Sequence, residues 1–327
     1  MSQIVVEGLT KTYQIAEREP GPWGAVRGLF RRRYRRVVAV RDVSFSVESG
    51  ELIGYVGPNG AGKSTTIKIL AGILVPDSGR CRVLGRVPWR ERVAHTARIG
   101  VVFGQRTQLW WDLPVIESFE LLRDIYRVPE TVYRKHRDEL VDRLELSPLL
   151  DTPVRQLSLG QRMRCDLAAA LLHGPAVLFL DEPTIGLDAA SKLAVRDFLW
   201  EINRERNVTI LLTTHDMDDI EALCSRVIVI ADGEVFYDGS LEGLRARVTN
   251  ERRLIVDLED PGLPLRVEGA VEIQREGHRR VLSFDPTKTP TPLLIADVTA
   301  KYPVRDLFVE NPPIEEIVAQ LYRDRER

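Results

Sequence analysis

The sequence predicts an α/β fold in which a mainly parallel sheet carries helices on its faces, followed by a small α+β domain. Three observations support this prediction. Between residues 51 and 231, short apolar runs of strand length alternate with helix-length amphipathic segments. A glycine-rich turn joins the first of these runs to a helix-like segment. Beyond about residue 245, strands and helices are separated by turn-rich stretches.

The N-terminal part is expected to begin with two strands, because apolar and polar residues alternate there. A short apolar strand then precedes the glycine-rich turn and its helix. The strands are expected at 3–15, 37–47, 51–56 and 98–103, and the helix at 64–72.

The middle of the chain, from about 107 to 172, is expected to be mainly helical. Apolar residues recur at three- and four-residue spacing in 117–126 and 132–146. Strands and helices then alternate until a hairpin at 232–239. The alternating strands are expected at 177–180, 208–213 and 226–231, and the helices at 189–204 and 216–224.

The last part of the chain is expected to be a separate domain. The first domain would cover 1–240 and the second 245–327, with a boundary near 241–248. The stretches DPGLP and DPTKTPTP are turn-rich separators within the tail. In this tail we expect strands at 252–258 and 280–284, and helices at 293–301 and 314–323.

Composition and cysteine usage are those of an ordinary globular chain. Its 327 residues are 44% hydrophobic and 29% charged, which suffices for a sizeable core and two domains. The net charge of −2 says nothing about binding to a nucleic acid or a membrane surface. We expect no nucleic-acid partner. Cys81, Cys165 and Cys224 lack metal-ligand spacing, which favours reduced thiols.

The sequence contains no signal for membrane insertion. No apolar run approaches the ~18 residues that cross a bilayer. The N-terminus lacks the basic-then-apolar pattern of a signal peptide. We therefore expect a protein that is made and stays in the cytosol, with any membrane-spanning part supplied by another chain.

The glycine-rich turn GPNGAGKST, at residues 57–65, matches a phosphate-binding loop, with an apolar strand before it and a helix after it. Glycines let backbone N–H groups converge on phosphate oxygens, and the helix N-terminus adds positive potential. The alternative is a glycine-rich turn with an incidental lysine, and the loop alone does not distinguish a kinase, a GTPase or a helicase. The expected phosphate-binding residues are Gly57, Pro58, Asn59, Gly60, Ala61, Gly62, Lys63, Ser64 and Thr65. Lys63 would give a point charge to the outer phosphates, and Ser64 would ligate Mg²⁺.

A second motif, AVLFLDEPT at residues 176–184, brings two adjacent carboxylates to a strand end. Asp181 would hold Mg²⁺ through water, and Glu182 would polarise the attacking water as general base. Taken alone, the motif fits equally well a strand that ends in a solvated acidic turn.

A third motif, LSLGQ, stands directly before a helical run, and the three motifs in this order resemble the ABC ATPase family. The resemblance implies a P-loop NTPase core with an antiparallel β subdomain and a helical subdomain at about 107–172. In the family, this signature contacts the γ-phosphate of ATP held by the opposite subunit. Glycine is commonest where Leu159 stands, whereas the contacting Ser158 and Gly160 are kept. The signature residues are Leu157, Ser158, Leu159, Gly160 and Gln161.

Four further positions match the family. Gln105 resembles the glutamine that senses Mg²⁺ and the γ-phosphate and relays to the transmembrane partner. His215 resembles the switch histidine that contacts the γ-phosphate, and Tyr13 the aromatic residue that stacks on adenine. A half-buried strand tyrosine is the alternative for Tyr13. The D-loop, which crosses the dimer interface, would be Gly186, Leu187 and Asp188.

The resemblance also implies a mechanism. Two chains would align head to tail and enclose two ATP molecules, with Mg²⁺ held by Ser64, Gln105 and Asp181 and catalysis by Glu182, His215 and Lys63. ATP binding would close the pair and hydrolysis would reopen it. The dimer would drive separate permease subunits from the cytoplasmic face of the cell membrane.

The direction of transport is expected to be export. The segment VFGQRTQLWWDLPVIESFELL, at 102–122, looks most like ATPases of drug- and polysaccharide-type exporters. The tail resembles the accessory domain of such ATPases, most recognisably at 306–322, and is assigned to dimer contacts or regulation. The alternatives are an importer ATPase, which often ends in a longer all-β domain, and an ABC ATPase without a transport role.

Two features lie outside the motor motifs. The insert at 16–37 contains RGLFRRRYRR at 27–36, which would be either a basic amphipathic element against anionic lipid or the permease, or a solvated extension of the first hairpin. Trp110 and Trp111 stand where the family's groove receives the permease. For one of these two tryptophans, we expect burial in the core of the helical subdomain instead.

Overall fold

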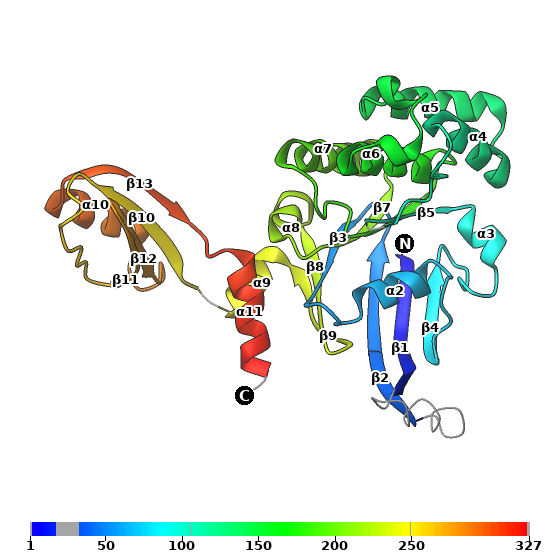
Figure 1. Ribbon diagram of the computed structural model, residues 1–327. Coiled ribbons are helices and arrows are strands. Elements are labelled where there is room, and N and C mark those ends of the chain that lie inside the picture. The colour runs from blue at the N-terminus through cyan, green and yellow to red at the C-terminus, as the bar shows by residue number, and fades with distance from the viewer. Residues whose placement is uncertain (1, 18–32, 105, 249, 326–327) are drawn as a thin grey trace, which may run out of the picture. The chain divides into compact units, whose positions relative to one another are not determined.

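The computed structural model describes residues 2–17, 33–104, 106–248 and 250–325 (Figure 1). The chain divides into two compact units, Met1–Gly239 and Ser240–Arg327. The stretch near which we placed the boundary is helix α9 (Leu241–Val248), which belongs to the second unit. Its Leu241 and Leu244, three residues apart, are buried, which explains why the segment is a helix rather than a linker.

The first unit is built on a six-stranded sheet whose central strands are fully buried and rich in valine, isoleucine and leucine, as parallel strands covered on both faces are. Strand β3 pairs in parallel with β7 and β8, and β6 pairs in parallel with β5 and β7. The carboxyl ends of β3, β6 and β7 therefore meet at one edge of the sheet. The strand order is β5 (Ile99–Phe103), β6 (Val177–Asp181), β7 (Thr209–Thr213), β3 (Leu52–Val56), β8 (Arg226–Ala231) and β9 (Glu234–Ser240).

A second sheet of this unit is antiparallel, in the order β2 (Arg33–Glu48), β1 (Ser2–Glu17) and β4 (Ser78–Val83). Helix α2 (Lys63–Leu70) buries Ile67, Ile69 and Leu70 in a core that it shares with both sheets. The short helix α3 (Arg92–Thr96) follows β4 (Figure 1). The sequence did not indicate β4, because the strand begins with serine, glycine and arginine and only two of its six side chains are buried.

Helices α4 to α7 gather at one end of the first unit (Figure 1). Their apolar faces follow helical spacing; Val115, Phe119 and Leu122 of α4, for example, are buried. The elements after β5 are α4 (Val115–Tyr126), α5 (Glu130–Arg143), the 3₁₀ turns η1 (Ser147–Leu149) and η2 (Val154–Gln156), α6 (Leu159–Leu171), α7 (Ala189–Arg206) and α8 (Met217–Leu223). Parallel strands, an antiparallel sheet and a helical region confirm the predicted α/β class for the first unit.

The second unit contains an antiparallel sheet in the order β11 (Ala270–Glu276), β12 (Arg279–Phe284), β10 (Arg252–Leu258) and β13 (Val304–Glu310). Leu254, Val256 and Phe284 pack with Leu294 and Val298 of α10 (Thr291–Lys301) into one core. Helix α11 (Ile314–Arg325) ends the unit. The edge strands β11 and β13 were not expected, since their side chains are mostly exposed and lack a continuous apolar run.

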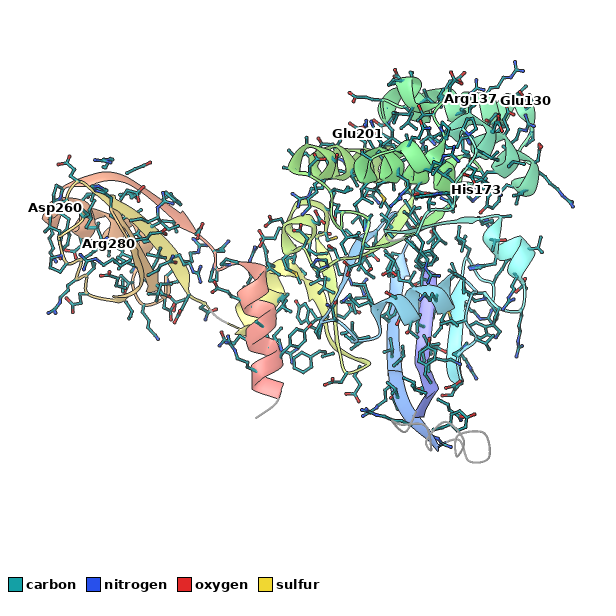
Figure 2. All side chains as sticks on the ribbon, in the orientation of Figure 1. Glu130, Arg137, His173, Glu201, Asp260 and Arg280 are labelled. Atoms are coloured by element: carbon teal, nitrogen blue, oxygen red, sulfur yellow. The ribbon has the colours of Figure 1, made fainter. Side chains whose placement is uncertain are left out.

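A buried arginine fastens the loop before β11 in the second unit. Arg280, which is labelled in Figure 2, is fully buried. Its guanidinium donates to the carbonyl oxygens of Gly277 at 2.7 Å and Pro261 at 2.5 Å. The carboxylate of Glu272 lies 3.7 Å from its Nε atom. A buried guanidinium group is tolerated here because backbone carbonyl oxygens accept hydrogen bonds from its N–H groups.

The structure bears on two expectations that do not concern the nucleotide-binding motifs, namely the basic insert and the paired tryptophans. The described ends of the basic insert continue the β1–β2 hairpin, with Glu17 opposite Arg33 and Gln14 opposite Arg36. The rest of the insert, residues 18–32, lies outside the described residues. The expectation that one of the paired tryptophans is buried is wrong: Trp110 and Trp111 are 38% and 51% exposed, and Leu109 takes the buried position. Among the described residues, no helix is both long enough and apolar enough to span a bilayer.

Candidate nucleotide-binding site

The glycine-rich turn bridges the end of β3 and the start of α2, and two of its positions require glycine. A Cβ atom at Gly57 would lie 2.2 Å from the carbonyl oxygen of Ile230. At Gly62, where φ is +105°, a Cβ atom would lie 2.2 Å from the carbonyl oxygen of Ala39. No side chain fits at either position, so the backbone itself lines the turn.

Lys63 is the first residue of α2 and is only 6% exposed. Its Nζ atom donates to the carbonyl oxygens of Gly57 at 2.6 Å and Pro58 at 3.2 Å. Burial lowers the pKa of the ammonium group, and the nearby carboxylates of Glu182 and Asp181 oppose that shift. The turn thus holds a positive charge next to its own backbone N–H groups.

Ser64, the next residue of the loop, reaches the end of β6. The Ser64 hydroxyl donates to Oδ1 of Asp181 at 3.1 Å, and the Thr213 hydroxyl donates to the same oxygen at 2.7 Å. The backbone N–H of Gly104 donates to the carbonyl oxygen of Asp181 at 2.8 Å. Hydroxyl and carboxylate oxygens are ligands that Mg²⁺ prefers, so Ser64 and Asp181 together suit such an ion.

Glu182 and His215 form a pair beside this turn. The imidazole Nδ1–H donates to Oε2 of Glu182 at 2.5 Å. Glu182 has φ +58°, a conformation that L-residues rarely adopt, and its backbone N–H donates to the Thr213 carbonyl oxygen at 2.9 Å. The Glu182 carboxylate is largely shielded, whereas the imidazole is exposed.

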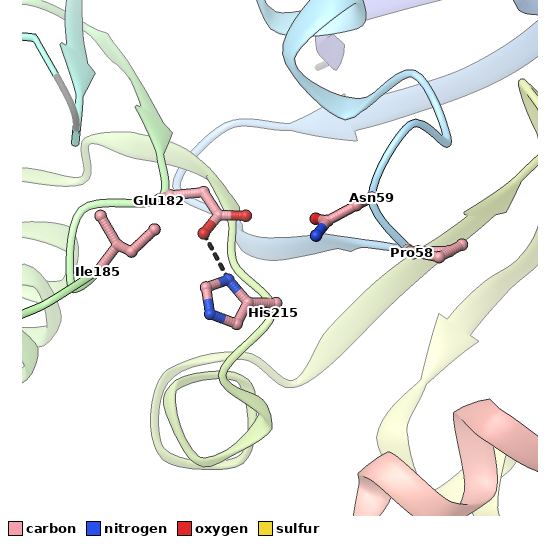
Figure 3. Close-up of a pocket in the computed structure, with 6 residues that line it drawn as sticks. Pro58, Asn59, Glu182, Ile185 and His215 are labelled. Carbon is pink, nitrogen blue, oxygen red and sulfur yellow. Dashed lines mark hydrogen bonds and ion pairs between the residues drawn. The ribbon is translucent and has the colours of Figure 1, made fainter.

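A cavity of about 410 Å³ separates this pair from the glycine-rich turn. Figure 3 shows Asn59 and Pro58 on one side of it and Glu182, Ile185 and His215 on the other. The lining residues are Gly57, Pro58, Asn59, Glu182, Ile185 and His215. The cavity therefore joins a positively charged, N–H-rich loop to a carboxylate that is able to polarise a water molecule.

The LSLGQ segment forms the N-terminus of α6. Ser158 caps the helix by accepting from the Gln161 N–H at 3.2 Å, while the Ser158 N–H donates to the Gln161 side chain at 2.9 Å. Gly160 packs against α7, where a Cβ atom would lie 2.5 Å from the Ser191 hydroxyl. The expected D-loop is adjacent, because a Cβ atom at Gly186 would lie 3.0 Å from Leu159.

Asp188 closes the D-loop by capping α7. It accepts from the backbone N–H and from the hydroxyl of Ser191, each at 2.9 Å. None of the described lining residues of the cavity comes from LSLGQ or from the D-loop. Most predicted site residues of one chain thus lie in two groups. One group surrounds the cavity, and the other lies at the N-termini of α6 and α7.

The remaining predicted residues have separate positions. The Tyr13 hydroxyl lies 3.5 Å from the Thr65 hydroxyl, at the first turn of α2. Gln105 lies outside the described residues. Two residues near the cavity, Thr213 and Ile185, were not predicted from the sequence. Thr213 was detectable in principle, because it ends the strand that neighbours β6, and a strand-end hydroxyl in register with Asp181 can reach its carboxylate.

Fold and site together define a P-loop nucleoside triphosphatase. Residues 40–185 match the family model described as ABC transporter. The ABC transporter ATP-binding protein NatA of Bacillus subtilis is 36% identical over 66% of this chain and 87% of its own length. The daunorubicin resistance ATP-binding protein DrrA3 of Streptomyces coeruleorubidus is 32% identical over 90% of this chain and 95% of its own length. The chain therefore belongs to the ABC transporter family.

Solved structures agree with this assignment. A dimeric ATP-binding cassette in a post-hydrolysis state, bound to ADP and Pi, is 27% identical, with a TM-score of 0.60 over 73% of this chain and 98% of that one. CbiO1 of Clostridium perfringens, part of the ABC transporter complex cbiONQ, is 28% identical, with a TM-score of 0.60 over 75% of this chain and 91% of that one. The chain is an ABC transporter ATP-binding subunit and an ATPase.

Proposed function

We propose that this chain binds ATP with Mg²⁺ in the cavity between residues 57–65 and the Glu182–His215 pair, and that Glu182 is the general base of hydrolysis. The observation that carries the proposal is the placement of this pair opposite the phosphate-binding loop across one cavity. The buried Lys63 charge and the loop N–H groups would bind the outer phosphates. Tyr13, next to Thr65, would stack on the adenine ring.

The residues present fit Mg²⁺. Ser64 and Asp181 already share a hydrogen bond, and both offer oxygen ligands. The described residues hold no group of three or more acidic, histidine or cysteine side chains suited to a metal, so phosphate oxygens and water would complete the shell. Gln105 is proposed as a further ligand. Bound Mg²⁺ would neutralise charge that develops on the transferring phosphoryl group.

We propose that a second copy completes the site. The Ser158-capped start of α6 offers backbone N–H groups and a helix N-terminus, a combination that suits a γ-phosphate. Since none of these residues lines the cavity of the same chain, the phosphate they bind would belong to the partner copy. The solved cassette of similar fold is dimeric, which supports the presence of a second copy.

The transport partner is proposed to be a set of integral membrane permease subunits, with the ATPase at the cytoplasmic face of the cell membrane. Export is favoured because the similarity to the daunorubicin resistance protein extends over 90% of this chain. Import is the second candidate, since the methionine import protein MetN of Geobacillus kaustophilus is 36% identical over 73% of this chain and 66% of its own length.

The Glu182→Gln variant tests the proposal. The amide cannot accept a proton, so steady-state phosphate release should fall by about 100-fold or more, while ATP binding persists. Glu120→Gln is the matched control, because Glu120 is exposed on α4, and this variant should hydrolyse ATP at the parent rate. Undiminished hydrolysis in Glu182→Gln would remove Glu182 from the proposed mechanism.

A further inference from the structure

A fully buried carboxylate lies behind the Glu182–His215 pair. Asp219, on α8, is 0% exposed. Its Oδ2 atom accepts a hydrogen bond from the Thr184 hydroxyl and lies 3.4 Å from the Thr214 hydroxyl. Its Oδ1 atom accepts from Nε of Arg196 at 2.5 Å. One carboxylate thus joins the turn after β6, the loop after β7 and helix α7.

We infer that Asp219 is a positioning residue that fixes the turn bearing Glu182 to the loop bearing His215. Thr184 follows Glu182 by two residues, and Thr214 directly precedes His215. The left-handed backbone of Glu182 persists only if its surroundings hold it, and the Thr184–Asp219 hydrogen bond is such a restraint. The inference rests on the proposed roles of Glu182 and His215.

Helix α7 is the third element of this network. Arg196 binds Asp219 and also lies 3.7 Å from Asp216, which in turn pairs with Lys192 of the same helix. Asp216 follows His215 directly and caps α8. Two positive side chains of α7, which begins at the expected D-loop, therefore pair with two carboxylates, one directly after His215 and one within α8. A shift of α7 would move the Glu182 turn and the His215 loop together.

Thr184 is the sharpest place to test this role. Thr184→Val keeps the shape of the side chain and removes one donor to Asp219, whereas Thr184→Ser keeps the donor. Thr209→Val is the matched control, because Thr209 is also fully buried and its hydroxyl binds Gln3 and the Gly50 N–H away from the cavity. Both valine variants lose buried hydrogen bonds, but only one loses a bond to Asp219.

We expect Thr184→Val to lower kcat by about tenfold or more, as the loss of a hydrogen bond to a charged group would, with the dissociation constant for ATP changed by less than about twofold. Thr184→Ser should restore kcat, and Thr209→Val should leave it at the parent value even if thermal stability falls. Asp219→Asn, which keeps the volume and removes the charge, should lower kcat in the same way.

A single-turnover assay in the Glu182→Gln background separates positioning from general destabilisation. If Thr184 acts through Glu182, then adding Thr184→Val to Glu182→Gln should lower the residual rate by less than about twofold. Equal kcat losses in Thr184→Val and Thr209→Val, or fully additive losses with Glu182→Gln, would overturn the inference. If Glu182→Gln itself hydrolyses ATP at the parent rate, the proposed function fails instead.

Discussion

At the residue scale, the site depends on single charges held against the backbone. Lys63 illustrates this, because its ammonium group is buried and bonded to two carbonyl oxygens of its own turn. Both carbonyl oxygens are weak partners for a cation in comparison with a phosphate oxygen. The lysine is therefore positioned to exchange these contacts for contacts to ATP.

Removing this cation should weaken nucleotide binding. In Lys63→Ala we expect the ATP dissociation constant to rise by about ten- to a hundredfold, the range for a lost hydrogen bond to a charged group. Equilibrium dialysis with radiolabelled ATP measures this dissociation constant directly. Lys68→Ala, on the same helix, is the charge-matched control and should bind like the parent. Parent-like affinity in Lys63→Ala would contradict the interpretation of the loop.

The sequence predicted the site residues that belong to a recognisable motif. Lys63, Asp181 and Glu182 stand in motifs that follow apolar strands, whereas His215 was assigned through the resemblance to ABC ATPases. The parallel pairing of β3, β6 and β7 brings these strand ends to one edge. The buried Asp219 was not predicted, because its role depends on Thr184 and other partners that only the tertiary fold brings together.

At the element scale, the contact between α6 and α7 links the signature to the D-loop. Gly160 allows this contact, since any side chain there would displace the Ser191 hydroxyl, which donates a hydrogen bond to Asp188. In Gly160→Ala, we expect ATPase activity to fall by about tenfold while ATP still binds the phosphate loop, because the loss affects only contacts needed in the closed dimer.

Phosphate release and equilibrium dialysis on the same preparation separate the two effects. Gly243→Ala, at an exposed position of α9, is the control and should keep full activity. Loss of ATP binding in Gly160→Ala, or retention of full hydrolysis, would argue against the assigned role of this helix N-terminus.

Elements were predictable in proportion to their burial. The central strands β3, β6 and β7 are continuous apolar runs and were found almost to the residue. The strands β11 and β13 were missed because edge strands carry mostly exposed side chains, and backbone pairing rather than burial defines them. The tryptophans after β5 show the reverse error, since we expected one of the two to be buried and both are exposed.

At the scale of the whole molecule, the chain holds the parts of a composite site in two separate groups. The cavity group includes Glu182 and His215, and the second group includes Ser158 and Asp188. Composition and spacing did not predict that the second group serves another copy; that expectation came from the resemblance to ABC ATPases. We therefore propose that ATP joins two chains.

Light scattering of Glu182→Gln after gel filtration tests this claim most directly. With Mg²⁺ and ATP, we predict the mass of two chains, because bound ATP bridges the phosphate loop of one copy and the signature of the other. With ADP, or with Lys63→Ala added, we predict the mass of one chain. A one-chain mass with ATP, or a two-chain mass that does not depend on the nucleotide, would contradict the account.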